Sequence, residues 1–301
     1  MIFNTLLYKL LNEHLTAPVS MLYPLLPEQE IVCSDSNPFV KKFYESCFEI
    51  TLKVTASLTG GKQSYQITLT TCPEDGNAYE LLVSVLVTIN GTKNWIDFDL
   101  WKGEQTAFEL VLDAEKLILG FSLDVHDILA PRDLHTGGNF RNLRVLSSKN
   151  EYFVNATALN ELGGSLFKDW YTRECTGETT IVTTEFDDDE LNVLLKACCA
   201  YSSIVVARQT FDTLLRIAWK HKIVAVLRAI ENYLLNARGV HVIDKLDLSY
   251  KYKFALLGSG VLKTLGNQFQ RKEILLDYLR TKNIPFCPQH LLEILEVQSL
   301  Y

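Results

Sequence analysis

A strict alternation of apolar and polar residues from Phe48 to Leu58 is the feature that most limits the fold. A period of two buries one face of a strand and leaves the other in water, as in antiparallel sheets. Further alternating segments follow between residues 65 and 123, and Gly60-Gly61 and Asn90-Gly91 supply turns. Residues 79–89 are apolar on both faces, which predicts a central strand. About six strands with short turns predict a small β-sandwich over residues 47–125.

The segment before the sandwich has a different pattern. Residues 2–15 place apolar side chains on one helical face, which suits either packing against the same chain or a contact with a partner. Residues 16–46 contain four prolines, and Pro24 and Pro27 block a regular helix. We therefore expect an N-terminal helix and a proline-containing arm over residues 1–46.

Residues 126–140 contain Pro131 and Gly137-Gly138, so they are expected to form a linker. This stretch also holds residue types that bind metals, namely His126, Asp127, Asp133 and His135. It has no cysteine and no closely spaced histidine pair, which favours solvated turn residues over a metal site.

Helical spacing dominates the chain after Arg141. Two short strands flank the turn at Lys149-Asn150, two short helices follow with Gly163-Gly164 between them, and a further strand covers residues 180–182. The acidic run that starts at Asp187 reads as a helix N-terminus, because Glu190 completes a capping box. Caps are expected at Asn155, Ser165 and Thr210. The pattern predicts a mixed domain over residues 141–238 and an all-helical extension over residues 239–301. Within the extension, Gly258-Ser259-Gly260 is expected to separate two helices, and further helices are expected near residues 273–280 and 289–297. The chain as a whole is therefore expected to be α+β.

Composition narrows the classes of function. The net charge is −7 and the pI about 5.5, which argues against nucleic-acid binding because that binding draws on phosphate neutralisation. No apolar run approaches the ~20 residues that a membrane helix needs. The seven cysteines include no CxxC pair, which favours reduced thiols in the cytoplasm or nucleus over disulfides or a zinc site. Nucleotide loops such as GxGxxG do not occur, so no cofactor is expected.

The sequence also offers little for catalysis. No Ser/His/Asp, Cys/His or paired-carboxylate set has a persuasive spacing, although such sets assemble in space rather than along the chain. His221 is expected to be a structural or a surface residue. Trp95 and Trp101, with Asp97 and Asp99 between them, suit a ligand face, but packing is the more common use of such aromatics. A non-enzymatic protein is therefore expected.

The ordered pattern after Arg141 resembles a BTB/POZ domain. The segment LRVLSSKNEYFVNATALNELGGSLFKDWY resembles the family's opening hairpin and short helices, and FDTLLRIAWKHKIVAVLRAIENYLL resembles its most recognisable helical pair. The last helices resemble the helical extension of the branch that is expanded in nematodes. A β-sandwich ahead of such a domain resembles the MATH–BTB arrangement, which makes the sandwich MATH-like by domain order alone.

This resemblance implies a homodimeric, non-catalytic adaptor that holds a substrate on the sandwich and docks its second domain onto cullin-3 of a ubiquitin ligase. The dimer interface would include Leu159 and Leu162. The positions that match the family's cullin contacts are Trp170, Tyr171, Arg173, Glu174, Cys175, Glu178, Cys199 and Tyr201. Two departures favour an alternative, a dimerising structural or regulatory subunit that does not bind cullin. The family's loop usually carries a hydrophobic-x-Glu signature, but here it reads Cys175-Thr176-Gly177, and Glu178 comes one residue later than the family's glutamate. Cys199 stands where the family often has an aromatic residue.

Overall fold

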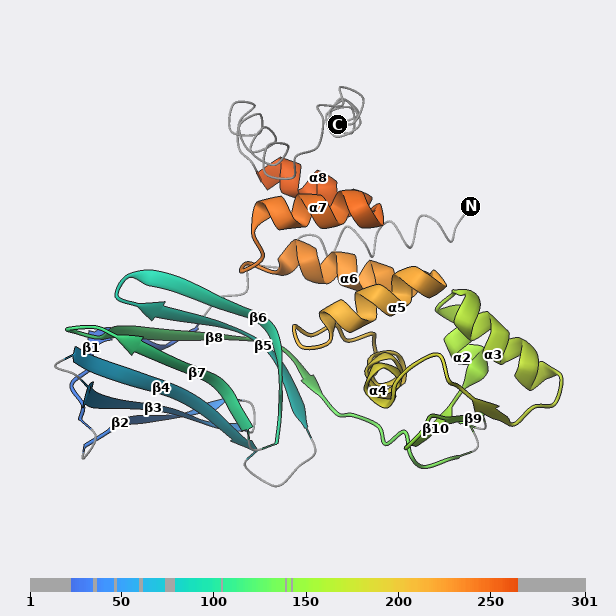
Figure 1. Cartoon of the computed structure of the whole chain (residues 1–301), viewed down its shortest axis with the longest axis horizontal. Coiled ribbons are helices and arrows are strands. Elements are labelled where there is room, and N and C mark those ends of the chain that lie inside the picture. The colour runs from blue at the N-terminus through green and yellow to red at the C-terminus, as the bar shows by residue number, and fades with distance from the viewer. Residues whose placement is uncertain are drawn as a thin grey trace. The chain divides into compact units, whose positions relative to one another are not determined.

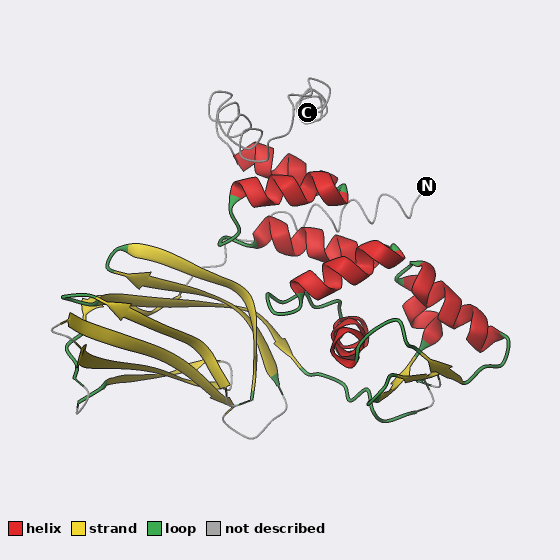
Figure 2. Ribbon diagram, in the orientation of Figure 1, coloured by secondary structure: helices red, strands yellow, loops and turns green. Residues whose placement is uncertain are grey.

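The computed structural model describes residues 23–34, 37–45, 48–59, 62–73, 79–103, 105–138, 140–141 and 143–264. The chain divides into two compact units, Met1–Leu129 and Ala130–Tyr301. Strands fill the described part of the first unit, and helices dominate the second (Figures 1 and 2). The protein is therefore a mixed α+β protein, as the change of period along the sequence predicts.

The first unit consists of two antiparallel four-stranded sheets, with orders β1-β8-β5-β6 and β2-β3-β4-β7. Their inner faces share one apolar core, in which Phe43 from one sheet stacks on Phe121 from the other at 5.9 Å between ring centroids. The strands are β1 (Tyr23–Glu30), β2 (Phe39–Glu45), β3 (Phe48–Thr59), β4 (Lys62–Pro73), β5 (Glu80–Ile89), β6 (Thr92–Lys102), β7 (Gln105–Asp113) and β8 (Ile118–Leu129).

Three details of this sandwich differ from the sequence prediction. β1 and β2 lie within the predicted arm, so eight strands replace the six expected. Pro24 and Pro27 lie in β1, an edge strand, where a residue without an N–H is tolerated. β8 continues to Leu129, so His126 and Asp127 belong to a strand and not to a linker.

The central position predicted for residues 79–89 is confirmed, because β5 pairs with β8 on one side and β6 on the other. The helix predicted for residues 2–15 lies outside the described residues.

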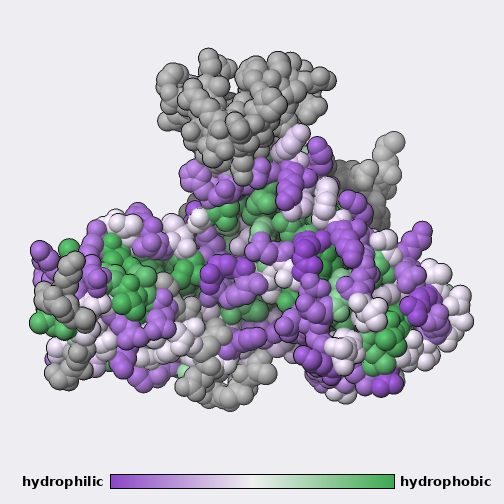
Figure 3. Space-filling view, in the orientation of Figure 1, coloured by the Kyte–Doolittle hydropathy of each residue, from purple (hydrophilic) through white to green (hydrophobic). Residues whose placement is uncertain are grey.

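The second unit opens with a small sheet of order β10-β9-β11, in which β9 pairs antiparallel with β10 and parallel with β11. Two helices lie between β10 and β11, and the other helices follow β11. Figure 3 shows hydrophilic and hydrophobic residues interleaved on the visible face of the molecule. The elements are β9 (Leu143–Leu146), β10 (Glu151–Val154), α2 (Ala156–Glu161), α3 (Ser165–Cys175), β11 (Thr180–Val182), α4 (Asp188–Leu195), a π-helix η1 (Lys196–Ala200), α5 (Phe211–His221), α6 (Val224–Asn236), α7 (Val242–Tyr252) and α8 (Ala255–Thr264).

The capping residues confirm part of the prediction. The side chain of Asn155 accepts a hydrogen bond from Ala158 N–H, and Asp187 and Glu190 form a complete capping box at α4. Ser165 is not a cap, because its hydroxyl donates to the carbonyl of His221 instead. The helix starting at Phe211 has no side-chain cap bond, so the cap predicted at Thr210 is wrong.

The helical extension begins as predicted but is divided at another residue. Lys253 adopts φ +57° and ends α7, whereas α8 runs through Gly258 and Gly260, which were expected to separate two helices. Glu231 of α6 is buried and accepts a hydrogen bond from Leu257 N–H at 3.0 Å. This bond satisfies one of the free N–H groups in the first turn of α8 and ties the extension to the preceding helices. The helices predicted near residues 273–280 and 289–297 lie outside the described residues.

Candidate functional site

The C-terminal end of α3 holds the exposed part of the predicted partner site, and we call Tyr171, Arg173, Glu174, Cys175 and Glu178 the α3 surface. Cys175 and Glu178 are exposed, and Tyr171, Arg173 and Glu174 are partly so. The helix ends because Gly177 turns the chain at φ +95°, and Glu178 N–H then donates to the carbonyl of Arg173. The structure therefore gathers these five residues on one short stretch of surface.

Charge and hydrogen bonding order the α3 surface. The guanidinium of Arg173 donates two hydrogen bonds to Glu178 Oε2, at 2.7 and 3.0 Å. This pairing lowers the pKa of Glu178 and raises that of Arg173. A hydrogen bond with the Cys175 thiol raises the pKa of Tyr171. The late position of Glu178 thus has a physical consequence, because its carboxylate is held by Arg173 of the same chain.

The other predicted partner residues lie inside the second unit. Trp170 is only 2% exposed and packs edge-to-face on Phe167 at 5.7 Å between ring centroids. Tyr201 is buried, and burial raises the pKa of the Cys199 thiol to about 12. Trp170 and Tyr201 pack in the core of the unit, so they are corrected from partner contacts to packing residues, whereas Cys199 is partly exposed.

The two predicted dimer residues behave differently from each other. Leu159 is buried in its own chain with Ala156, the other buried residue of α2, which removes it as a surface contact. Leu162 is partly exposed, and its carbonyl accepts a hydrogen bond from Ala225 N–H at the start of α6. The family positions thus fall into two groups, one that builds the core and one that reaches the surface.

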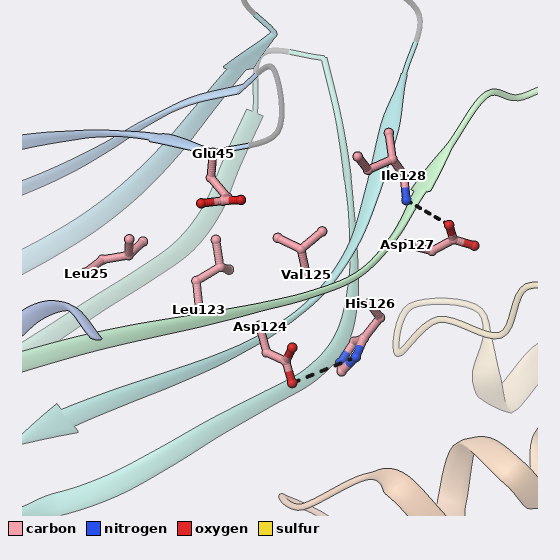
Figure 4. A pocket seen from close by; sticks show the side chains of 8 residues that line it. All are labelled: Leu25, Glu45, Leu123, Asp124, Val125, His126, Asp127 and Ile128. Carbon is pink, nitrogen blue, oxygen red and sulfur yellow. Dashed lines mark hydrogen bonds and ion pairs between the residues drawn. The ribbon is translucent and has the colours of Figure 1, made fainter. Parts of the chain in front are cut away.

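The sandwich contains a polar cluster that sequence spacing does not show. Ser84 on the central strand β5 lies between bulges in both neighbouring strands, one near Phe98 in β6 and one near His126 in β8. His126 Nε2 lies 2.7 Å from Ser84 Oγ, and His126 Nδ1 lies 3.9 Å from Asp124 Oδ2 (Figure 4). The rings of His126 and Phe98 stack at 4.3 Å between centroids. We call Ser84, His126 and Asp124 the sandwich trio.

The geometry of the sandwich trio favours a structural role over nucleophilic catalysis. Ser84 Oγ accepts a hydrogen bond from Phe98 N–H at 3.1 Å, which leaves its own proton for the imidazole of His126. Ser84 is only 2% exposed, so a substrate has no access to the hydroxyl. The separation of 3.9 Å between the imidazole and Asp124 also exceeds a hydrogen bond. The trio links the two bulges across the central strand.

The remaining candidates from the sequence are dispersed. Asp133 and His135 lie in an ordered turn of the second unit, where Asp133 accepts a hydrogen bond from His135 N–H, whereas His126 and Asp127 belong to β8 of the first unit. Within the described ranges, no group of three or more His, Cys, Asp or Glu side chains is placed to hold a metal ion. Trp101 is buried in the sandwich core and donates to Asp99 at 3.0 Å, so it does not form an exposed ligand face.

His221 has a structural setting, as expected. It is buried beside the Phe186 ring and lies 3.4 Å from the Glu185 carboxylate. Burial lowers the pKa of this imidazole, partly opposed by Glu185. The carbonyl of His221 accepts a hydrogen bond from the Ser165 hydroxyl, and this bond joins the start of α3 to the end of α5.

No protein-family model matches this chain, and no curated protein matches it either. No helix of the described segments is long and apolar enough to cross a membrane.

Proposed function

We propose that this protein is a non-catalytic protein-interaction scaffold of the MATH–BTB type, which adapts a substrate protein to a cullin-3 ubiquitin ligase. The observation that carries this proposal is the order of elements in the second unit. A hairpin, two short helices, a strand added parallel to the hairpin and then pairs of helices follow one another in the order that the BTB/POZ resemblance implies. An antiparallel sandwich precedes them, as in MATH–BTB proteins.

In this proposal the sandwich holds the substrate and the α3 surface contacts cullin-3. The protein acts as a homodimer in the cytoplasm or nucleus, without a cofactor and without contact to nucleic acid or membrane. The exposed α3 surface supports the docking role, because Tyr171 supplies an aromatic ring and Arg173 a planar guanidinium. Aromatic residues and arginine contribute most of the energy in protein interfaces.

A second candidate follows from the same surface. The carboxylate of Glu178 is paired with Arg173, and Trp170 and Tyr201 are buried in the core. A cullin-binding surface assembled from the family positions would therefore be reduced to the end of α3. This reduction favours a dimerising structural or regulatory subunit that binds another partner.

Size-exclusion chromatography with light scattering tests both candidates, using the full chain alone and with the N-terminal part of cullin-3. The adaptor proposal expects a dimer that comigrates with cullin-3. Arg173→Asp should weaken the complex at least ~10-fold, about 1.4 kcal/mol, because it removes the guanidinium and repels Glu178. Lys93→Asp, the same reversal at the exposed start of β6, should leave it unchanged.

Each outcome has a defined meaning. A dimer that ignores cullin-3 contradicts the adaptor and supports the second candidate. A monomer that ignores cullin-3 contradicts both. A complex that both reversals weaken equally would show that the contact is electrostatic and unspecific, which also contradicts docking through the α3 surface.

A further inference from the structure

His221 carries a buried ring nitrogen without a hydrogen-bond partner. The residue is only 7% exposed, and its Nε2 atom is enclosed and makes no hydrogen bond with the described part of the chain. Most buried polar atoms in proteins have such a partner, so this exception needs an explanation. A neutral imidazole tolerates the position better than an imidazolium, because the cation needs an acceptor for each of its two N–H groups. The packing around His221 therefore depends on its protonation state.

One carboxylate oxygen is shared between this imidazole and a lysine. Nε2 lies 3.4 Å from Glu185 Oε1, and the same oxygen lies 2.7 Å from the ammonium nitrogen of Lys220. The negative charge of Glu185 is thus already paired. A proton on Nε2 would place a second cation beside the one oxygen, inside a buried contact where repulsion between like charges is poorly screened.

The other neighbours of the ring add no compensating charge. Among the described residues, Glu185 and Lys220 are the ionised side chains that act on the imidazole. The start of α3 contributes Ser165, which is uncharged and donates to the His221 carbonyl at 3.2 Å. On α4, Glu190 is paired with Arg216. Glu185 is therefore the acceptor that a protonated His221 would have to use.

The contact around the ring has a fixed side and a looser side. His221 is the last residue of α5, and its carbonyl is held by Ser165 beside Gly164, where a Cβ would lie 2.9 Å from that oxygen. The other side is Glu185-Phe186, a bend between β11 and α4 that belongs to neither helix nor strand. The buried Phe186 ring lies 5.5 Å from the imidazole between centroids. An unfavourable charge here is relieved most readily by movement of residues 185–186.

The direction of the pH effect follows from the same contacts. Burial lowers the pKa of His221, Glu185 opposes this change, and Lys220 adds to it. The dipole of α5 also favours a cation at this end, but Ser165 already occupies the last carbonyl of the helix. An imidazole with a lowered pKa in the closed contact takes up a proton more readily once the contact opens. The closed contact is therefore fully stable above the ordinary pKa of 6.5 and loses stability as the pH falls below it.

We propose that His221 is an acid-sensitive latch, which holds residues 185–186 against the end of α5 while it is neutral and releases them when it takes up a proton. Release exposes the apolar ring of Phe186 and lets the imidazolium reach water. Histidine suits this use because its charge changes near neutral pH. The latch belongs to the second unit alone and goes beyond the proposed function, since it needs neither cullin-3 nor a dimer.

Amide hydrogen exchange of the full chain between about pH 7.5 and about pH 5 tests the latch, after correction for the intrinsic pH dependence of exchange. We expect opening of residues 185–187 to increase by up to ~10-fold per pH unit below 6.5, the limit for one proton taken up per opening. His221→Gln should abolish this increase. Lys220→Gln leaves Glu185 to the imidazolium and should reduce it. The matched control Lys168→Gln, at an exposed position of the same unit, should leave it unchanged.

A titration of the histidine ring protons by NMR gives an independent measure. His221 should titrate below 6.5 in the unaltered chain and closer to 6.5 in Lys220→Gln. A titration at or above 6.5, or an increase in exchange that persists in His221→Gln, overturns the proposal. His135→Gln removes an exposed histidine of the same unit and should keep the full increase, so its loss there as well also overturns the proposal. If His221→Gln does not fold, Lys220→Gln and the titration of the unaltered chain decide.

Discussion

Gly164 should be among the least replaceable residues of the second unit, and a matched glycine makes this measurable. Gly164 has φ +98° and ψ 154°, a conformation that is essentially restricted to glycine. A Cβ there would lie 2.9 Å from the carbonyl oxygen of His221 and 2.9 Å from Ile223 Cγ1. Gly177 has nearly the same φ, +95°, but a Cβ there would meet nothing within 4 Å. The two positions separate backbone strain from steric overlap.

The expected magnitudes follow from these two terms. Gly177→Ala should cost about 1–2 kcal/mol in the free energy of unfolding, from strain alone. Gly164→Ala adds overpacking of about 1–3 kcal/mol to strain of about 1–3 kcal/mol, so about 2–6 kcal/mol in total. With a urea slope of about 2 kcal/mol per M, the overpacking term alone should place the midpoint of Gly164→Ala about 0.5–1.5 M below that of Gly177→Ala.

The assay is urea unfolding followed by far-UV circular dichroism. The described helices all belong to the second unit, so the helical signal reports the unfolding of that unit. A midpoint for Gly164→Ala that equals or exceeds that of Gly177→Ala would refute the reasoning, because the close approach to His221 and Ile223 would then carry no cost.

Three further results are expected. Glu231→Ala should leave Leu257 N–H unsatisfied, cost about 1–3 kcal/mol and speed amide exchange in α8, whereas Glu231→Gln keeps an acceptor and should cost less. Hydrogen bonds from Ser147 and its neighbours lower the pKa of Asp188 in the folded protein. The stabilisation by this carboxylate is therefore present above its ordinary pKa near 4 and is lost as the pH falls through the lowered pKa. Asp188→Asn should flatten the acid side of the plot of unfolding free energy against pH, and an unchanged plot would contradict this. A fluorophosphonate probe should not label Ser84 in the native chain, and rapid labelling that Ser84→Ala abolishes would contradict a non-catalytic sandwich.

The sequence predicts those parts of the fold in which pattern and burial agree. Alternation over Phe48–Leu58 corresponds to β3, and the doubly apolar segment corresponds to the central strand β5. β1 and β2 were missed for physical reasons. β1 contains two prolines, which normally signal a break but are tolerated on an edge. β2 reads FVKKFYE, in which apolar residues come in adjacent pairs and hide the period of two.

The candidate site on α3 shows the limit of transferring residues by pattern. A family pattern identifies helices through their apolar spacing, so it aligns buried and exposed positions with equal ease. Trp170 is buried and packs on Phe167, whereas Arg173, at the C-terminal end of the same helix, is partly exposed and pairs with Glu178. Only the three-dimensional structure separates these two roles.

The sandwich trio could not be predicted from the sequence, because its geometry depends on two β-bulges. A bulge adds one residue to a strand and exchanges the faces of everything that follows. The sequence places Ile96, Phe98 and Leu100 together on the apolar face of β6 and places Asp99 in water. In the structure the bulge near Phe98 reverses the second half of the strand. Asp99 then lies opposite the buried Val83 and is itself only 2% exposed.

The same reversal explains both a stabilising contact and the polar cluster. A buried carboxylate is costly unless it is hydrogen-bonded, and the indole N–H of Trp101 supplies such a bond to Asp99 at 3.0 Å. At the bulge, the ring of Phe98 stacks on His126, and the backbone N–H of Phe98 donates a hydrogen bond to Ser84 Oγ. The second bulge brings His126 to Ser84 from β8. Two inserted residues thus set which side chains of the sandwich face the core.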